Sequence, residues 1–300
     1  MFTKKTAWLP VFSLLVATIL WASSFIALKL AFRSYDPMFV IFGRMVVASA
    51  CFLFFLPGFL KKIDYRPGDI RLIGLMVLCE PCLYFIFEAR ALENTTASQA
   101  GMLCATLPLI VAVVARIFLK ETISHRMVAG FLLAIIGASW LSISAESSQD
   151  APNPALGNFY EFVAMVCAAG YVTTCKYLTA RYSPFFLTAI QAFVGAVFYL
   201  PLIYLPEPSL PTAFVPVPAL AVVYLGAVVT LGAYGCYNFG VSKMPASQAT
   251  AFINLIPVFT VILGWLILGE KFNLMQYLAA ATVFAGVILS QDSIGGKAAV

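Results

Sequence analysis

Long apolar runs separated by short polar segments fill almost the whole chain of 300 residues. A helix needs about 20 apolar residues to cross the hydrocarbon core of a bilayer. Ten runs approach that length, at residues 8–31, 37–59, 70–91, 97–119, 126–144, 157–179, 184–205, 217–241, 247–268 and 273–290. The pattern therefore predicts an all-α membrane protein with ten transmembrane helices.

Two of the runs are copies of each other. Residues 97–121 read ASQAGMLCATLPLIVAVVARIFLKE, and residues 246–270 read ASQATAFINLIPVFTVILGWLILGE. Equivalent residues, such as Pro108 and Pro257, lie 149 positions apart. A repeat of this length sets the architecture of the whole chain.

The repeat extends over both halves of the chain, with five predicted helices in each. Five is an odd number, so the second copy enters the membrane from the opposite side. We expect a 5+5 inverted repeat, with residues 1–145 as the first copy, 146–156 as a linker, and 157–300 as the second copy and a short C-terminal tail. Many secondary transporters have this arrangement, with their binding site near the middle of the membrane.

Composition excludes a soluble globule, because 62% of the residues are hydrophobic and only 10% are charged. The net charge of +5 is an orientation signal and does not indicate nucleic-acid binding, since the basic residues lie in short loops. They concentrate at 60–71, 120–126, Arg181 and Lys243, on the face that also holds both termini. Positive loops face the cytoplasm. The expected location is the cell inner membrane, multi-pass, with both termini cytoplasmic and the first apolar run retained as a helix.

No catalytic motif stands out. The seven cysteines all lie in predicted spans, and the spacing of Cys79 and Cys82 is attributed to chance because no second pair lies nearby. The single histidine, His125, lies in a loop. Neither a phosphate-binding loop nor a nucleophile or two-histidine metal motif is present in the sequence. We expect no enzyme activity, no cofactor and no metal.

The third run carries charged residues at helical spacing. Glu80, Tyr84 and Glu88 follow i, i+4, i+8 and share one face of a helix. A carboxylate at the bilayer centre is costly, about 2.5–3.5 kcal/mol on insertion scales, so these side chains should avoid lipid. Arg44 in the second run lies at a similar depth. Two interpretations remain open: a structural ion pair with Arg44, or a carboxylate that takes a proton or holds a cationic group during transport.

The repeated prolines predict two kinks. Pro108 and Pro257 lie near the middle of their runs and cannot donate a backbone hydrogen bond, so the carbonyls of Cys104 and Ile253 should lose their helical partners. Such kinks either let helices pack and rock, or expose the freed carbonyls to a cavity. Other side chains that could line a cavity at this depth are Trp21, Thr106, Tyr171, Tyr234, Asn238 and Asn254.

Polar residues also mark the starts of two repeated helices. Gln99 and Gln248 follow Ser98 and Ser247, and these serines can cap the free amide groups there. The alternative is an anion or carboxylate site at the positive end of the helix. Glu161, early in the sixth run, is expected near the outer interface, at the surface or at a gate.

Several segments resemble the EamA-type branch of the drug/metabolite transporter superfamily. They are WASSFIALK, ALENTTASQAGMLCATLPL, FLKE and MPASQATAFINLIPVFTVILGWLILGE, and the resemblance covers essentially the whole chain. It implies a carrier with a 5+5 inverted repeat, a central cavity among helices 1, 3, 4, 6, 8 and 9, and helices 5 and 10 at the periphery. Many members export amino acids or other small metabolites.

The resulting prediction is a secondary active transporter that moves a small polar metabolite by alternating access. An amino acid or a related amphipathic compound is the expected cargo, and export the expected direction. The expected partners are the small-molecule substrate and the lipid bilayer, with no nucleic acid. Protons as a coupling ion remain open, as do a monomer and a homodimer. The alternatives are a lipid-headgroup flippase and a structural membrane subunit that transports nothing.

Overall fold

The protein is helical throughout the part of the chain that the computed structural model describes, residues 8–53, 65–119, 125–205, 210–244, 249 and 252–291. Over these residues there is no β-strand, only an isolated bridge between Ser148 and Ala151. Six helical segments are long and apolar enough to cross a membrane: Trp8–Phe32, Asp69–Asn94, Ala97–Val114, Pro154–Leu178, Pro184–Leu202 and Pro216–Lys243. Four shorter apolar helices are Pro37–Leu53, Val128–Ile143, Phe252–Leu268 and Leu274–Leu289.

Several of these segments are interrupted by a turn of different helical geometry. The elements in chain order are α1 (Trp8–Phe32), α2 (Pro37–Leu53), α4 (Asp69–Val77), η2 (Leu78–Leu83), α5 (Tyr84–Asn94), α6 (Ala97–Leu103), η3 (Cys104–Thr106), α7 (Leu107–Leu119), α8 (His125–Ile143), α9 (Pro154–Leu178), α10 (Pro184–Leu202), α11 (Pro216–Tyr224), η4 (Leu225–Ala233), α12 (Tyr234–Lys243), η5 (Phe252–Leu255), α14 (Ile256–Leu263), η6 (Gly264–Leu268) and α15 (Leu274–Gln291).

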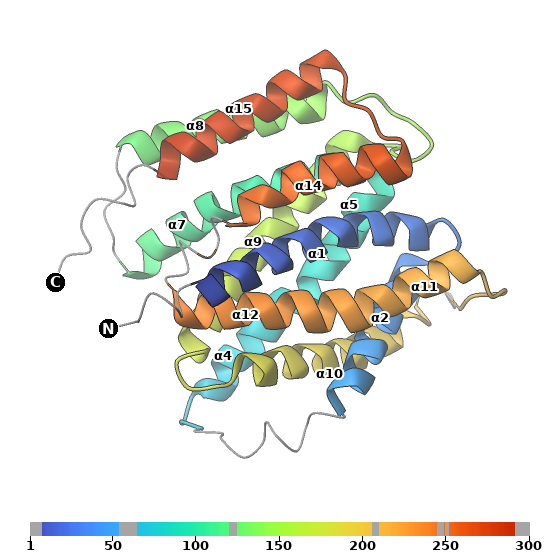
Figure 1. The fold of residues 1–300 in the computed structure, drawn as a ribbon, viewed down its shortest axis with the longest axis vertical. Helices are drawn as coiled ribbons and strands as arrows, with labels where there is room; N and C mark the ends of the chain where they lie inside the picture. The colour runs from blue at the N-terminus through green and yellow to red at the C-terminus, as the bar shows by residue number, and fades with distance from the viewer. Residues whose placement is uncertain are drawn as a thin grey trace.

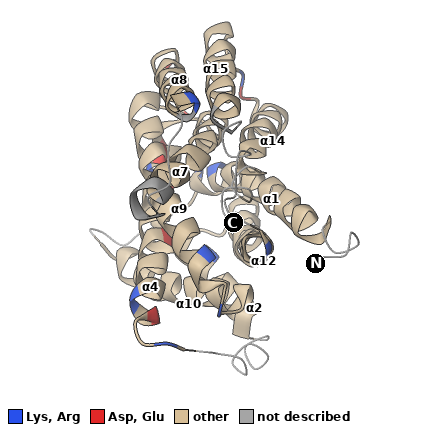
Figure 2. Ribbon diagram, turned by 90° about the vertical axis from the view of Figure 1, so that its left-hand side faces the viewer, with Lys and Arg blue, Asp and Glu red and all other residues tan. Residues whose placement is uncertain are grey.

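The helices run back and forth across one bundle, and Trp8 and Gln291 lie at the same end of it, on the left in Figure 1. The main helix pairs are α8 with α15, α2 with α10, α6 with α14, α5 with α9, and α1 with α12. The α8–α15 pair forms the upper edge of the bundle in Figure 1. Seen from the end that holds Trp8 and Gln291, the ribbon carries few charged residues (Figure 2). The predicted peripheral position of the fifth and tenth runs agrees with this arrangement.

Glycines set the distance between α8 and α15. A Cβ atom at Gly137 would lie 2.6 Å from the backbone nitrogen of Val283, and one at Gly286 would lie 2.6 Å from the carbonyl oxygen of Gly130. No side chain fits at these positions, so the two backbones approach directly, as in membrane helix pairs built on small residues. Large apolar side chains instead cover the outside of the bundle: Ile143 is 82% exposed and Val197 is 73% exposed. Lipid is the solvent that suits such a surface.

The third span is broken at Glu80, which corrects the regular helix expected over residues 70–91. Glu80 has extended backbone angles (φ −150°, ψ 117°), and Pro81 has no amide hydrogen to donate. Side chains of α10 donate hydrogen bonds to three carbonyls at this break. Gln191 Nε2 donates to the Glu80 carbonyl at 3.0 Å, and the Tyr199 hydroxyl donates to the carbonyls of Pro81 (3.0 Å) and Cys82 (2.6 Å). The break is therefore tolerated inside the membrane because neighbouring side chains satisfy the backbone.

The breaks near Pro108 and Pro257 differ from the predicted mid-helix kinks. Each proline follows a short 3₁₀ segment, η3 or η5, and lies in the first turn of the next helix. There its missing amide costs little. In the first copy the Leu107 amide donates to the Cys104 carbonyl, so that carbonyl keeps a partner and the expectation that it is freed was wrong.

Candidate functional site

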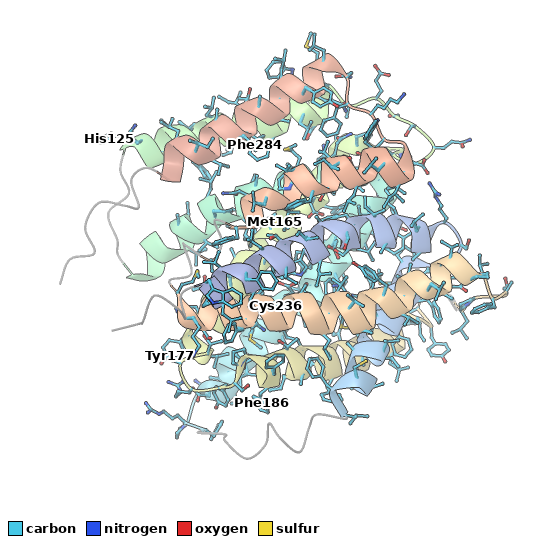
Figure 3. The ribbon with its side chains drawn as sticks, in the orientation of Figure 1. His125, Met165, Tyr177, Phe186, Cys236 and Phe284 are labelled. Atoms are coloured by element: carbon cyan, nitrogen blue, oxygen red, sulfur yellow. The ribbon has the colours of Figure 1, made fainter. Side chains whose placement is uncertain are left out.

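A small cavity lies in the middle of the bundle, where Met165 of α9 is labelled in Figure 3. Water-sized spheres can occupy about 40 Å³ of it. That is room for a few water molecules, since one needs about 10–15 Å³ on this measure. The side chains around it are Trp21, Ser24, Phe25, Arg44, Glu80, Tyr84, Glu88, Cys104, Leu107, Met165, Ala168, Tyr171, Val172, Tyr234, Ile253 and Ile256. The lining thus combines aromatic and aliphatic groups with three charged residues.

Two carboxylates face this cavity, and each accepts a tyrosine hydrogen bond. Glu80 and Glu88 are each 3% exposed. The Tyr234 hydroxyl donates to Glu80 Oε1, and the Tyr84 hydroxyl donates to Glu88 Oε1 at 3.0 Å. The break at Glu80 positions its carboxylate, because the extended backbone turns away from the helical course of α4. The two acids predicted to share a helix face do meet at one cavity.

Arg44 is the cation of the cavity, and its contact with Glu88 is a long ion pair. Its guanidinium Nη1 is 3.8 Å from Glu88 Oε2, while its Nε donates to Thr230 Oγ1 at 2.8 Å. The guanidinium also lies 4.2 Å from the centre of the Phe85 ring, a favourable cation–π position. Its Nη1 makes no hydrogen bond within the described part of the chain. Arg44 is thus held in place by its neighbours and keeps an unused donor.

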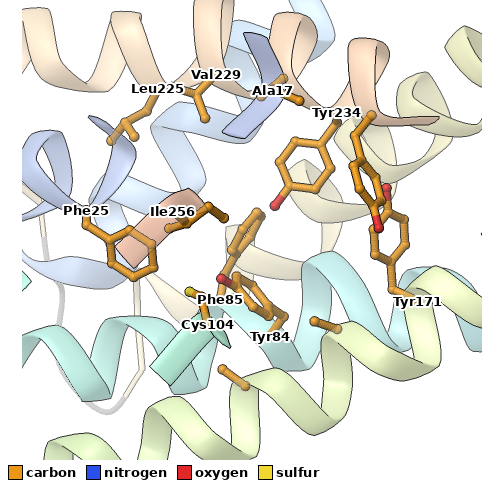
Figure 4. Packing of buried hydrophobic residues seen from close by; sticks show 14 of the residues in the cluster. Ala17, Phe25, Tyr84, Phe85, Cys104, Tyr171, Leu225, Val229, Tyr234 and Ile256 are labelled. Atoms are coloured by element: carbon orange, nitrogen blue, oxygen red, sulfur yellow. The ribbon is translucent and has the colours of Figure 1, made fainter. Parts of the chain in front are cut away.

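Aromatic rings form one wall of the cavity. The ring centre of Trp21 lies 5.2 Å from that of Tyr234 and 4.7 Å from that of Tyr237. Tyr234 also contacts Phe85 at 6.4 Å and Tyr171 at 6.1 Å. Figure 4 shows the rings of Tyr84, Phe85 and Tyr234 close together, with Cys104 beside Tyr84. The Trp21 Nε1 hydrogen is buried without an acceptor among the described residues.

Some residues predicted for the site lie behind this lining. Asn238 accepts from the Tyr171 hydroxyl and donates to Thr188 Oγ1 at 2.8 Å, so it supports the wall. Thr106 donates to the Leu103 carbonyl at 2.7 Å. The remaining predicted residues outside the lining are Asn254, Pro108, Pro257 and Gln99, while Gln248 lies outside the described residues.

The start of α6 is capped differently from the prediction. Thr96, rather than Ser98, accepts a hydrogen bond from the Gln99 amide, at 3.2 Å. Glu270, from the other half of the chain, accepts from the amides of Ala97 (2.9 Å) and Ser98 (2.8 Å). A carboxylate does occupy the positive helix end, as one interpretation expected, but it belongs to the chain itself.

Glu161 is the main residue whose environment was predicted wrongly. It was expected near the surface or at a gate, but its side chain is 0% exposed. Its Oε1 lies 3.9 Å from Cys104 Sγ, and its Oε2 has no hydrogen-bond partner among the described residues. Asn158, one helical turn earlier, is also buried. Their i, i+3 spacing in an apolar helix was the available sequence signal for a buried polar face.

Polar contacts close both ends of the bundle. At the end near Trp8, Arg181 and Tyr182 both donate to Asp69, the latter at 2.9 Å. Burial, reinforced by this hydrogen bond, raises the pKa of Tyr182 to about 12. At the opposite end Lys29 donates to the Asp150 carbonyl, in addition to the Glu270 contact described above. Polar contacts of this kind are therefore present at both ends of the bundle.

Comparisons with known proteins agree with this architecture. The sequence matches the model of the EamA-like transporter family twice, at residues 8–143 and 155–291. It is 26% identical to the uncharacterized transporter YetK of Bacillus subtilis, over 93% of this chain and 85% of that protein. It is 25% identical to a probable terminal-alkyne amino-acid exporter of Streptantibioticus cattleyicolor, over 93% of this chain and 92% of that protein. A solved crystal structure with 18% identity has the same fold, with a TM-score of 0.65 over 95% of this chain and 96% of that one.

The resemblance drawn from the sequence motifs is confirmed by these matches, which cover almost the entire chain. The apolar spans and the lipid-suited surface described above are what such a protein requires. The chain is a multi-pass membrane protein and belongs to the EamA-like transporter family.

Proposed function

We propose that this protein is a secondary active transporter that moves a small amphipathic metabolite, an amino acid or a close relative, by alternating access. One observation carries the proposal: a cavity in the middle of the bundle lined by Glu80, Glu88, Arg44 and aromatic rings. Charged residues at this depth are expensive in a membrane and mark substrate or ion sites. No ATP-binding motif is present in the sequence, so an ion gradient or the gradient of the substrate itself would drive transport.

The unused hydrogen-bonding groups of the cavity favour a zwitterion. Arg44 Nη1 and Trp21 Nε1 are donors without acceptors among the described residues, and they suit a carboxylate. Glu80 and Glu88 suit an ammonium group, and the rings of Tyr171 and neighbouring aromatics suit both an ammonium and an apolar side chain. An amino acid supplies all three features in one small molecule. The similarity to a probable amino-acid exporter supports this class and the outward direction.

The cavity must widen to hold such a molecule. Its volume of about 40 Å³ is far below the roughly 300–1,000 Å³ of typical ligand sites. The small cavity and the contacts at both ends suit an occluded conformation. Binding would then follow release of one set of contacts, either around Asp69 or around Glu270.

We further propose that the ten apolar helices form a 5+5 inverted repeat, with residues 1–145 and 157–300 as the two copies and 146–156 as the linker. Three helix pairs join equivalent spans of the copies: α2 with α10, α6 with α14, and α8 with α15. The pairs α5 with α9 and α1 with α12 exchange under the same two-fold relation. The irregular segments support it too, since η2 and η4 interrupt the third span of each copy and η3 and η5 the fourth.

The distribution of basic residues supports the orientation. The start of α4 and the end of α12, which carry Arg71 and Lys243, lie at the bundle end where α1 begins and α15 ends (Figure 1), and Arg181 donates to Asp69 at the start of α4. We assign this end to the cytoplasm and the membrane to the cell inner membrane, so that both termini are cytoplasmic. The Glu270 end is then the outer end.

Counterflow in proteoliposomes tests the function. Vesicles containing the purified protein are loaded with an unlabelled amino acid, polyamine or nucleoside, and diluted into the same compound carrying a label. A carrier accumulates the label transiently for at least one amino acid, while protein-free vesicles do not. If no compound accumulates in vesicles with folded protein, the small-molecule proposal fails. Movement of a fluorescent phospholipid between leaflets in the same vesicles would then favour a flippase, and its absence would favour a structural subunit.

A further inference from the structure

We propose that Glu161 is a proton-binding site, reached from the outer end of the bundle through a file of polar side chains and separate from the substrate cavity. This rests on the proposed transport function and adds to it a coupling site. The file is made of Gln99, Asn158, Glu161 and Cys104. It begins at an outer pocket of about 300 Å³ that Gln99 lines together with Glu146, Asp150, Glu270 and Gln276, among others.

Hydrogen bonds hold the outer half of the file. Asn158 Nδ2 donates to Gln99 Oε1 and to Ser142 Oγ, each at 3.0 Å. Asn158 Oδ1 accepts from Thr95 Oγ1 at 2.9 Å. Asn158 is 2% exposed and has no unpaired polar atom, so its position is fixed by three different helices or helix ends. Amides and hydroxyls in such a row can hold water molecules that enter between them, and a proton can move along that water.

Close packing of α9 on α5 brings this file to the cavity. A Cβ atom at Gly157 would lie 2.7 Å from the backbone nitrogen of Thr95 and 2.8 Å from the carbonyl oxygen of Ala91. The missing side chain lets the two helices touch here. Glu161 lies one turn further along α9 than Asn158, about 4.5 Å deeper along the helix axis. Glu161 thus lies between the bonded file and the cavity.

The surroundings of Glu161 suit a proton and no other cation. Its Oε2 is fully buried and lacks a hydrogen-bond partner among the described residues. The titratable groups that face it are Glu88 and Tyr84 of α5 and Cys104 of η3, and none of these is basic. A buried carboxylate without a cation is very unfavourable as an anion, so a bound proton is the simplest way to neutralise it. Glu161 does not line the cavity, because Cys104 stands between them.

This placement suggests how a proton could be exchanged for a substrate. A proton on Glu161 Oε2 leaves Glu88, which lies 3.8 Å from Arg44, as the nearest acid able to hold the ammonium group of the substrate. Loss of that proton adds a second negative charge beside Glu88, and like charges at such sites disfavour each other. Protonation of Glu161 and binding of the substrate's ammonium group in the cavity would therefore be coupled through Glu88. Cys104 and Tyr84 lie between the two carboxylates.

Infrared spectroscopy of the full-length protein in lipid tests the proton site without any substrate. Wild type is expected to show a protonated-carboxyl band that disappears in alkaline buffer, and Glu161→Gln is expected to lack one component of it. The matched control is Glu146→Gln, an exposed acid of the outer pocket, which should leave the band unchanged. An unaltered band in Glu161→Gln would overturn the proposal. This result stands whether or not the protein transports the compounds of the panel.

Transport measurements test the coupling, with the labelled amino acid that wild type exchanges. Glu161→Gln is expected to keep counterflow, which needs no net proton movement, and to lose accumulation driven by a pH gradient. A purely structural role would reduce both together and would overturn the proposal. If Glu161→Gln does not fold, Gln99→Met serves instead, since it breaks the file with a side chain of the same shape. It should slow the deuterium exchange of the carboxyl band, and unchanged exchange would contradict the file.

Discussion

The hydroxyl of Tyr234 on α12 donates a hydrogen bond to Glu80, a residue 154 positions earlier in the chain. This contact joins the broken third span of one half to the interrupted eighth span of the other, across the central cavity. If the halves move against each other during transport, this bond between them must respond.

Tyr234→Phe removes this hydrogen bond while keeping the ring that contacts Trp21. A hydrogen bond to a charged group contributes about 1.5–3 kcal/mol, so we expect a lower unfolding temperature and about a tenfold lower rate of counterflow. Fluorescence-monitored unfolding in detergent and counterflow in vesicles measure the two effects. Tyr277→Phe is the matched control, since Tyr277 is 54% exposed on α15. Equal behaviour of the two variants would contradict a role for the Tyr234–Glu80 contact.

Arg44 and Glu88 should be energetically coupled. Arg44→Met leaves Glu88 buried without its cation and is expected to cost about 3–5 kcal/mol of folding stability. Adding Glu88→Gln removes the orphaned charge, so the double variant should be more stable than Arg44→Met alone. Arg90→Met, which breaks an exposed pair with Glu93, should change stability by less than about 1 kcal/mol. Additive losses in the double variant would argue that Arg44 is held by Thr230 and Phe85 alone.

Tyr182 should make stability depend on pH in the alkaline range. Its pKa is raised to about 12 in the folded protein from an ordinary value near 10, so folding favours the protonated hydroxyl that donates to Asp69. This contribution is complete below pH about 10 and is lost as the pH rises toward 12. Tyr182→Phe should therefore unfold at a lower temperature than wild type at neutral pH. The difference should shrink above pH 10, and a difference that stays constant or grows would exclude the Asp69 contact as its source.

The Glu270 contact should control access to the cavity from the outer end. Glu270→Gln removes the charge that caps the amides of Ala97 and Ser98, a change of about 0.5–2 kcal/mol. Cys104 lines the cavity and is 3% exposed, so it reports on opening. In a variant that keeps Cys104 as its sole cysteine, we expect Glu270→Gln to raise the rate of labelling by a membrane-impermeant thiol reagent. Glu146→Gln is the control, and equal labelling rates in the two variants would refute control of access by the Glu270 contact.

Local patterns predicted much of this molecule correctly. The apolar runs gave the helical spans to within a few residues at most of the described ends, because a bilayer imposes a length on each helix. The spacing of Glu80, Tyr84 and Glu88 indicated a shared polar face, and all three line the cavity with Arg44. Charges in apolar runs are informative because they are costly there.

What was missed depends on partners far away in the chain. The break at Pro81 is tolerated because Gln191 and Tyr199 bond the carbonyls around it, and nothing local to Pro81 specifies those residues. The cap of α6 comes partly from Glu270, 172 positions after Ser98. The burial of Glu161 follows from the close packing of α9 against neighbouring helices, which no spacing rule measures. The sequence pattern identified the polar and apolar faces of single helices. Which residues contact those faces could be seen only in the assembled bundle.

We propose that Glu80 and the cavity around it bind the small-molecule substrate, and counterflow of wild type beside Glu80→Gln is the decisive experiment. The substitution keeps the size of the side chain and the acceptor for Tyr234, and removes the charge. The account predicts transient accumulation of a labelled amino acid by wild type, and at least about a tenfold loss in Glu80→Gln with folding intact. Accumulation in the variant equal to that of wild type at every pH would contradict it and remove Glu80 from the mechanism.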